Sequence, residues 1–204
     1  MSYSAITGSE LKDNFGIDWE YRADLFRHIA PRPASDMLKS LLRETVPFAL
    51  AFGSEKARSE YIIAPIFFEL RQQAGRQISV FSGIELNVDR KRKLSGFCDF
   101  LVSRSPSQNI LEAPVVVAVE AKRQDFEKGI TQCLAEMIAA RIFNERRGRP
   151  IEEVYGCVTT GDVWRFLVLR GSLAEIEARS FDISDDLEKI LGLLWAMTFG
   201  EVEY

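Results

Sequence analysis

A run of five apolar residues, Val115 to Val119, constrains the fold of this chain more than any other stretch. Because polar residues do not alternate within the run, we expect a central β-strand that is covered on both faces. Glu120-Ala121-Lys122 follows directly, and an amphipathic helix is predicted to begin near Asp125 and to end at Arg147-Gly148-Arg149-Pro150. Successive strand residues point to opposite faces, so Glu120 and Lys122 should point to the same side while Ala121 points into packing.

A second acid lies on the strand predicted just upstream. Asp99 is the third residue of Phe97-Cys98-Asp99-Phe100-Leu101-Val102, and it can meet Glu120 and Lys122 at one edge of a sheet. Two neighbouring carboxylates repel each other unless a cation compensates them. Mg²⁺ or Mn²⁺ would do so and leave coordination positions open for a phosphate oxygen and a water. This pattern therefore predicts a phosphodiester-cleaving site in which Lys122 orients or deprotonates the water, or offsets charge on the phosphate.

The non-catalytic alternative is a strand-end salt bridge between Glu120 and Lys122. The tripeptide alone carries little information, since Glu10-Leu11-Lys12 has the same spacing and no strand before it. The preceding apolar strand, the upstream Asp99 and the following helix favour the metal-site interpretation of Glu120 and Lys122.

Residues 54 to 170 resemble the PD-(D/E)XK nuclease superfamily, whose core carries an Asp on one strand and (Asp or Glu)-x-Lys on the next. Asp99 and Glu120-Ala121-Lys122 match this motif, and Cys98 stands where the family often has Pro. The resemblance implies an α/β fold with a restriction-endonuclease-like core, a mixed central sheet flanked by helices. It also implies that Asp99 and Glu120 hold Mg²⁺ or Mn²⁺, with the carbonyl of Ala121 as a further candidate ligand, and that DNA is the substrate.

The resemblance extends to the helix predicted from Glu55 to Gln73. In the type I restriction-like branch this helix carries a Glu ahead of an "apolar-apolar-x-Pro" run, which Glu55 and Ile62-Ile63-Ala64-Pro65 match. Glu60 is the competing carboxylate, and an acid in a first helical turn is also favoured by the helix dipole. Some branches carry a site-facing Gln on the later helix, so Gln132 and Gln124 are candidate accessory residues, although a solvated polar face is the preferred interpretation.

Length and composition indicate an ordinary globular protein. The 204 residues are 47% hydrophobic and 27% charged, and we expect residues 1–53 to form a helical extension packed on a nuclease-like domain of residues 54–204. With no apolar run of about 18 residues and no secretory leader, we expect a cytoplasmic protein without a membrane span. Three well-separated cysteines and a single histidine argue against zinc and Cys/His nucleophile chemistry.

Net charge gives no sign of a strongly basic nucleic-acid binder, since it is −4 at pH 7. Basic clusters occur at Arg90-Lys91-Arg92-Lys93 and Arg146-Arg147-Gly148-Arg149, on either side of the candidate site in sequence. Phosphate contact and solvated loop charge are both open interpretations of these clusters.

The remaining elements follow from local signals. Pro47 should kink or end the second helix, and Ser82-Gly83 should form a bulge in the first strand. The expected elements are a helix from Asp18 to Ile29, a helix opened by Ser35 and closed by Gly53, a strand from Ile78 to Val88, a hairpin of Val154–Thr159 and Val163–Leu169, and a last helix capped by Ser184.

These features predict a metal-dependent nuclease that hydrolyses nucleic-acid phosphodiester bonds. Little chain remains for a sequence-reading module, so target choice would come from loops, a homodimer or a partner protein. The alternative is a nuclease fold kept as a nucleic-acid-binding or assembly module with little or no catalysis.

Overall fold

The structure, a computed structural model, describes residues 2–122 and 125–202. It has a mixed central sheet flanked by helices, which confirms the α/β class. In chain order the elements are η1 (Tyr3–Ala5), α1 (Gly8–Phe15), β1 (Asp18–Arg22), α2 (Asp36–Phe52), α3 (Glu55–Arg58), the π-helical turn η2 (Ser59–Ile63), α4 (Ala64–Gln73), β2 (Ser79–Glu85), β3 (Phe97–Ser103), β4 (Val115–Ala121), α5 (Phe126–Arg146), β5 (Glu153–Thr159), β6 (Val163–Arg170), β7 (Leu173–Glu177), β8 (Phe181–Asp182) and α6 (Ile183–Phe199).

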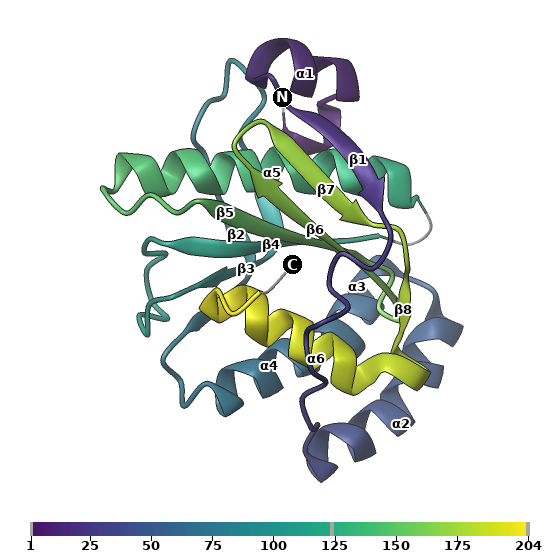
Figure 1. Cartoon of the computed structure of the whole chain (residues 1–204). Coiled ribbons are helices and arrows are strands. Elements are labelled where there is room, and N and C mark those ends of the chain that lie inside the picture. The colour runs from purple at the N-terminus through teal and green to yellow at the C-terminus, as the bar shows by residue number, and fades with distance from the viewer. Residues whose placement is uncertain (1, 123–124, 203–204) are drawn as a thin grey trace.

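The sheet has the strand order β1-β7-β6-β5-β4-β3-β2, and β8 pairs with β6. The pairs β4–β5 and β1–β7 are parallel, whereas the other neighbours are antiparallel. Every residue of β4 is buried, as expected for the apolar run at Val115. Helices cover both faces: α5 and α1 lie on one side, and α2, α4 and α6 lie on the other (Figure 1).

Two hydrophobic clusters fill the space between these layers. One joins α2, η2, α4 and α6 to the sheet, and in it Phe67 of α4 stacks on Phe100 of β3 with ring centroids 5.3 Å apart. The other joins α5, η1 and α1 to the opposite face. In the part of the chain that the structure describes, no helix has both the length and the apolar character needed to cross a membrane.

The N-terminal region differs from the prediction. The helix expected from Asp18 to Ile29 is wrong: Asp18–Arg22 is the edge strand β1, parallel to β7. Its partner lies about 155 positions later in the sequence, at Leu173–Glu177, so no local pattern could reveal the pairing. Residues 1–53 thus contribute a strand to the sheet as well as the helices α1 and α2.

Several helix ends fall where the sequence predicted. Ser35 and Ser54 cap α2 and α3 by accepting hydrogen bonds from backbone N–H groups, and Gly53 ends α2 in the left-handed conformation. Pro47 does not end α2, which continues to Phe52. The cap of the last helix is Asp182, two residues before the predicted Ser184.

The predicted bulge at Ser82-Gly83 is also wrong. The pairing of β2 with β3 keeps one register on both sides of Gly83, from Ser82 with Phe100 to Ile84 with Cys98. Gly83 instead adopts a φ of +62°, which a residue without Cβ reaches without strain.

Candidate active site

The candidate acids lie on neighbouring antiparallel strands. Asp99 is near the start of β3, Glu120 is near the end of β4, and the register between the strands pairs Phe100 with Val119. Asp99 Oδ2 accepts a hydrogen bond of 2.8 Å from the N–H of Ala121. The Asp99 carboxylate therefore lies against the peptide group that joins Glu120 to Ala121.

Glu120 is held from two directions. Its side chain is almost fully buried, and Oε1 forms an ion pair of 2.5 Å with Nζ of Lys122. Its Oε2 accepts a 2.7 Å hydrogen bond from Nε2 of Gln132, while Lys122 also donates to Oε1 of Gln132 at 3.1 Å. The salt bridge between Glu120 and Lys122 that the non-catalytic interpretation expects is thus present, and Asp99 lies beside it.

Gln132 was expected on a solvated face, and that expectation is wrong. Gln132 is only 8% exposed, because α5 is covered by the sheet on one side and by η1 and α1 on others. Its amide links Glu120 to Lys122, so it fixes the rotamers of both. Gln124, the other candidate, lies outside the described residues.

The buried carboxyls carry unfavourable charge. Burial raises the pKa of Glu120 to about 7, the charge of Asp99 adds to this rise, and the hydrogen bond from Lys122 opposes it. Burial likewise raises the pKa of Asp99, against the opposing hydrogen bond from Ala121. A cation placed between the two acids would remove this penalty.

Lys122 has the opposite balance. Burial acts to lower its pKa, but the hydrogen bond and charge of Glu120 outweigh burial and raise it. The ammonium group therefore keeps its proton near neutral pH. A role in orienting water or in offsetting phosphate charge fits this state better than a role as general base.

Glu136 belongs to the same cluster and was not among the predicted site residues. It is fully buried one helical turn beyond Gln132, whose Nε2 donates to Glu136 Oε1 at 3.3 Å. Burial and the charge of Glu120 raise the pKa of Glu136 well above its ordinary value, and Glu136 Oε2 is buried with no hydrogen-bond partner among the described residues. The raised pKa therefore favours the protonated form of Glu136. Glu136 follows Gln132 by four residues and so lies on the same face of α5, which was the sequence signal that could have identified it.

The structure separates the two candidate glutamates of the leading helix. Glu55 is the first residue of α3, and its charge raises the pKa of both Asp99 and Lys122, so it lies within electrostatic range of the site. Glu60 instead forms a surface ion pair of 2.6 Å with Lys56. Of the two, Glu55 is the one that the fold brings to the acids.

Close helix packing also shapes the site. A Cβ added at Gly129 of α5 would lie 2.7 Å from Cγ1 of Val158 and 3.0 Å from Cγ of Lys122. Only a glycine lets α5 approach β5 and the stem of Lys122 this closely.

The donor set suits a hard divalent ion with many waters. Within residues 2–122 and 125–202, no group of three or more His, Cys, Asp and Glu side chains is arranged to hold a metal. Mg²⁺ needs fewer protein ligands, since it is commonly bound through one or two carboxylates and water. Asp99, which is half-buried, and Glu120, which is buried, both have raised pKa values and fit that requirement, and the backbone carbonyl of Ala121 is a further candidate.

The two basic clusters do not meet at the acids. Arg146-Arg147-Gly148-Arg149 follows α5, a helix of 21 residues whose ends are about 30 Å apart, and the site is at the other end. In the Arg90–Lys93 loop, Lys93 pairs with Glu10 of α1, close to the same far end.

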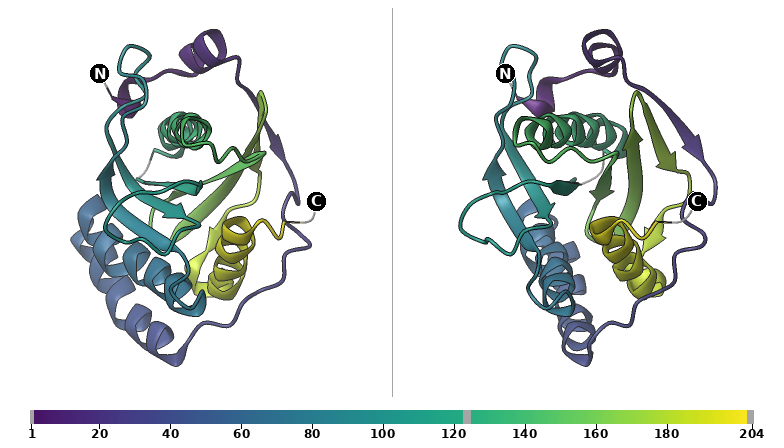
Figure 2. Two further views of the ribbon diagram at one scale, coloured as in Figure 1. Left: turned by 90° about the vertical axis from the view of Figure 1, so that its left-hand side faces the viewer. Right: turned by 60° about the vertical axis from the view of Figure 1, so that its left-hand side comes forward.

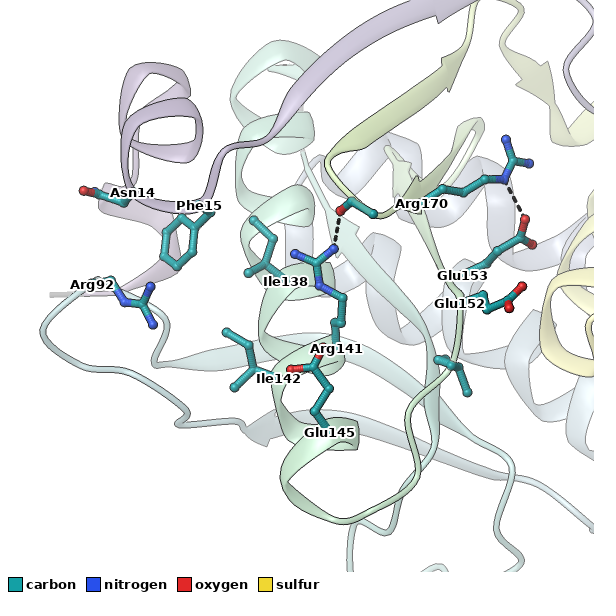
Figure 3. Close-up of a pocket in the computed structure, with 12 residues that line it drawn as sticks. Asn14, Phe15, Arg92, Ile138, Arg141, Ile142, Glu145, Glu152, Glu153 and Arg170 are labelled. Carbon is teal, nitrogen blue, oxygen red and sulfur yellow. Dashed lines mark hydrogen bonds and ion pairs between the residues drawn. The ribbon is translucent and has the colours of Figure 1, made fainter.

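A hollow of about 830 Å³ lies along α5 (Figure 3). Neither Asp99 nor Glu120 is among the residues that line it. Phe15, Ile138 and Ile142 form its apolar wall. Its arginines are engaged within the protein, since Arg141 donates to the carbonyl of Gly171 and Arg170 pairs with Glu153.

Comparisons of the chain with protein-family models, with curated proteins and with solved structures found no match. The function proposed below therefore rests on the residues and their geometry.

Proposed function

We propose that this protein is a metal-dependent nuclease with a restriction-endonuclease-like core of the PD-(D/E)XK type. The observation that carries the proposal is the packing of Asp99 against the Glu120–Ala121 peptide, with Lys122 paired to Glu120. Two partly or fully buried acids and a lysine at adjacent strand ends lower the stability of the fold, and a catalytic site explains why they occur together.

Each residue has a separate role in hydrolysis. Asp99 and Glu120 would hold the ion, which when bound supplies positive charge beside the phosphate and makes a coordinated water more acidic. Lys122 remains protonated, so it would donate a hydrogen bond to the attacking water or to a phosphate oxygen. Glu55 lies within electrostatic range of the same cluster and would orient a second water.

Gln132 and Glu136 support these groups. Gln132 donates to Glu120 and accepts from Lys122, so both side chains are positioned before substrate binds. Glu136 accepts a hydrogen bond from Nε2 of Gln132 and so helps to hold the Gln132 amide in place. We propose Mg²⁺ or Mn²⁺ as the cofactor and DNA as the substrate, the latter on the motif resemblance.

A second candidate function is a nuclease fold that binds nucleic acid or a protein without cutting. The observation in its favour is that Lys122 already occupies Glu120 Oε1, so an ion must compete with an internal ammonium. Weak metal binding with intact DNA binding would identify this case.

Plasmid cleavage under varied Mg²⁺ and Mn²⁺ concentrations tests the proposal. Asp99→Ala, Glu120→Ala and Lys122→Met should each reduce the rate by at least about 100-fold. Lys12→Met, at the exposed lysine of Glu10-Leu11-Lys12, is the matched control and should leave the rate unchanged. Metal-independent cleavage, or equal cleavage by all variants, would contradict the assignment.

A further inference from the structure

The chain between β2 and β3 continues their pairing beyond the sheet as a hairpin arm, defined here as residues 85–97. Its ladder includes Leu86 N–H to Gly96 O at 2.9 Å and Val88 N–H to Leu94 O at 3.0 Å. Figure 2 shows the arm extending alongside α5 to reach α1. Because β3 begins at Phe97, the arm starts two residues from Asp99.

The arm is fastened on its inner side. Leu94 is fully buried, Tyr3 donates from its hydroxyl to the carbonyl of Leu86, and Lys93 pairs with Glu10 at 2.6 Å. Arg92 pairs with Asp89 at 2.8 Å. The arm is therefore a preformed part of the fold whose position relative to β3 is set by side-chain packing.

The outer side of the arm has a different character. It carries a groove of about 710 Å³ whose lining includes Glu85, Asn87, Arg90, Lys91, Ser95 and Gly96. Arg90 and Lys91 form no ion pair with any residue in the described ranges, in contrast to Arg92 and Lys93. Two of the four basic residues thus stabilise the arm, and two remain free to meet an external anion.

An aromatic side chain stands between this groove and the catalytic acids. Phe97 is 68% exposed and lies opposite Glu85 in the β2–β3 ladder. An exposed ring at the edge of a phosphodiester-cleaving site offers a face for a base or a sugar. From Asp99 toward the turn of the arm, which we call its tip, the chain passes Phe97 first and then Lys91 and Arg90.

We propose that the outer face of the hairpin arm binds the nucleic-acid strand next to the scissile phosphate, an inference that rests on the proposed nuclease function. Phe97 contacts the nucleotide nearest Asp99, and Arg90 and Lys91 bind phosphates further along. Lys91 is eight residues from Asp99 along the chain, a span of at most about 26 Å, so the tip lies within about eight nucleotide steps of the acids.

Binding in EDTA separates this inference from catalysis. Fluorescence anisotropy with labelled duplex and single-stranded DNA of about 30 nucleotides measures affinity while cleavage is blocked. Arg90→Gln/Lys91→Gln should weaken binding about tenfold at about 0.1 M salt and lower the slope of log affinity against log salt by about two. Phe97→Ala should weaken single-strand binding by about tenfold. Arg27→Gln/Arg43→Gln removes the same charge from exposed positions outside the groove and serves as the control.

The outcomes discriminate clearly. A loss of DNA affinity that is limited to the arm variants, with unchanged thermal unfolding, supports DNA binding by the arm. If the wild type also cuts no DNA, the arm proposal still holds and the protein is a binding module. Equal loss in the control double variant, no effect of the arm variants, or no DNA binding by the wild type at low salt overturns the inference.

Discussion

Replacing Glu120 by Gln should remove a pH-dependent loss of folding stability that the wild type shows. The folded-state pKa of Glu120 is raised from 4.5 to about 7, chiefly by burial. A group whose pKa is higher in the folded state stabilises the fold below its unfolded pKa, and this contribution is lost as the pH rises through the folded pKa. The wild type should therefore become less stable between pH 4.5 and 7.

The magnitude follows from the size of the pKa rise. One pKa unit corresponds to about 1.36 kcal/mol, so a rise of about 2.5 units amounts to about 3 kcal/mol. Gln has no carboxyl proton and cannot contribute this dependence. The free energy of unfolding of Glu120→Gln, relative to wild type, should therefore increase by about 3 kcal/mol from pH 4.5 to pH 8.

Urea unfolding of both proteins at several pH values between 4.5 and 8 measures this difference. Glu145→Gln, at the exposed end of α5, is the matched control and should change stability little at any pH. A stability difference between Glu120→Gln and wild type that stays constant over this range would refute the assignment of a buried, repelled carboxylate at position 120.

Three further substitutions test the support of the site and the packing of the fold. Gln132→Ala removes the hydrogen bond that orients Glu120 and should weaken Mn²⁺ binding by about 10- to 100-fold in a calorimetric titration, with the fold retained. Lys122→Met should leave Glu120 without its cation. The free energy of unfolding of this variant should therefore be about 1–3 kcal/mol below that of wild type at pH 8 in urea unfolding. Gly192→Ala would place a Cβ 2.2 Å from the carbonyl oxygen of Ala30, and despite its better helix propensity it should lower stability by about 1–3 kcal/mol; an increase in stability would contradict the close packing of α6 on this segment.

The central part of the fold was predictable because its signals are local. The apolar run at Val115 specified a buried central strand, and serine caps at Ser35 and Ser54 marked the starts of two helices. Asp99 and Glu120-Ala121-Lys122 were identified from strand ends and spacing, and the structure brings them together.

The missed elements depend on distant partners. β7 carries two buried acids, and one of them, Glu175, is paired with Arg22 and Arg170 from other strands, so its sequence does not look like a core strand. Gln132 was misplaced for a similar reason, since the covering of α5 by N-terminal segments cannot be read from the helix itself. The helix α1 did have a local signal, the capping box of Thr7 and Glu10.

The most direct test of the metal-dependent site is calorimetric titration of Mn²⁺ and Mg²⁺ into the wild type, Asp99→Ala and Glu120→Ala, with plasmid cleavage measured on the same samples. The proposed site predicts ion binding by the wild type, loss of binding in both variants, and loss of cleavage with it. A wild type that binds no ion and cuts no plasmid would contradict it, as would undiminished ion binding in the two variants.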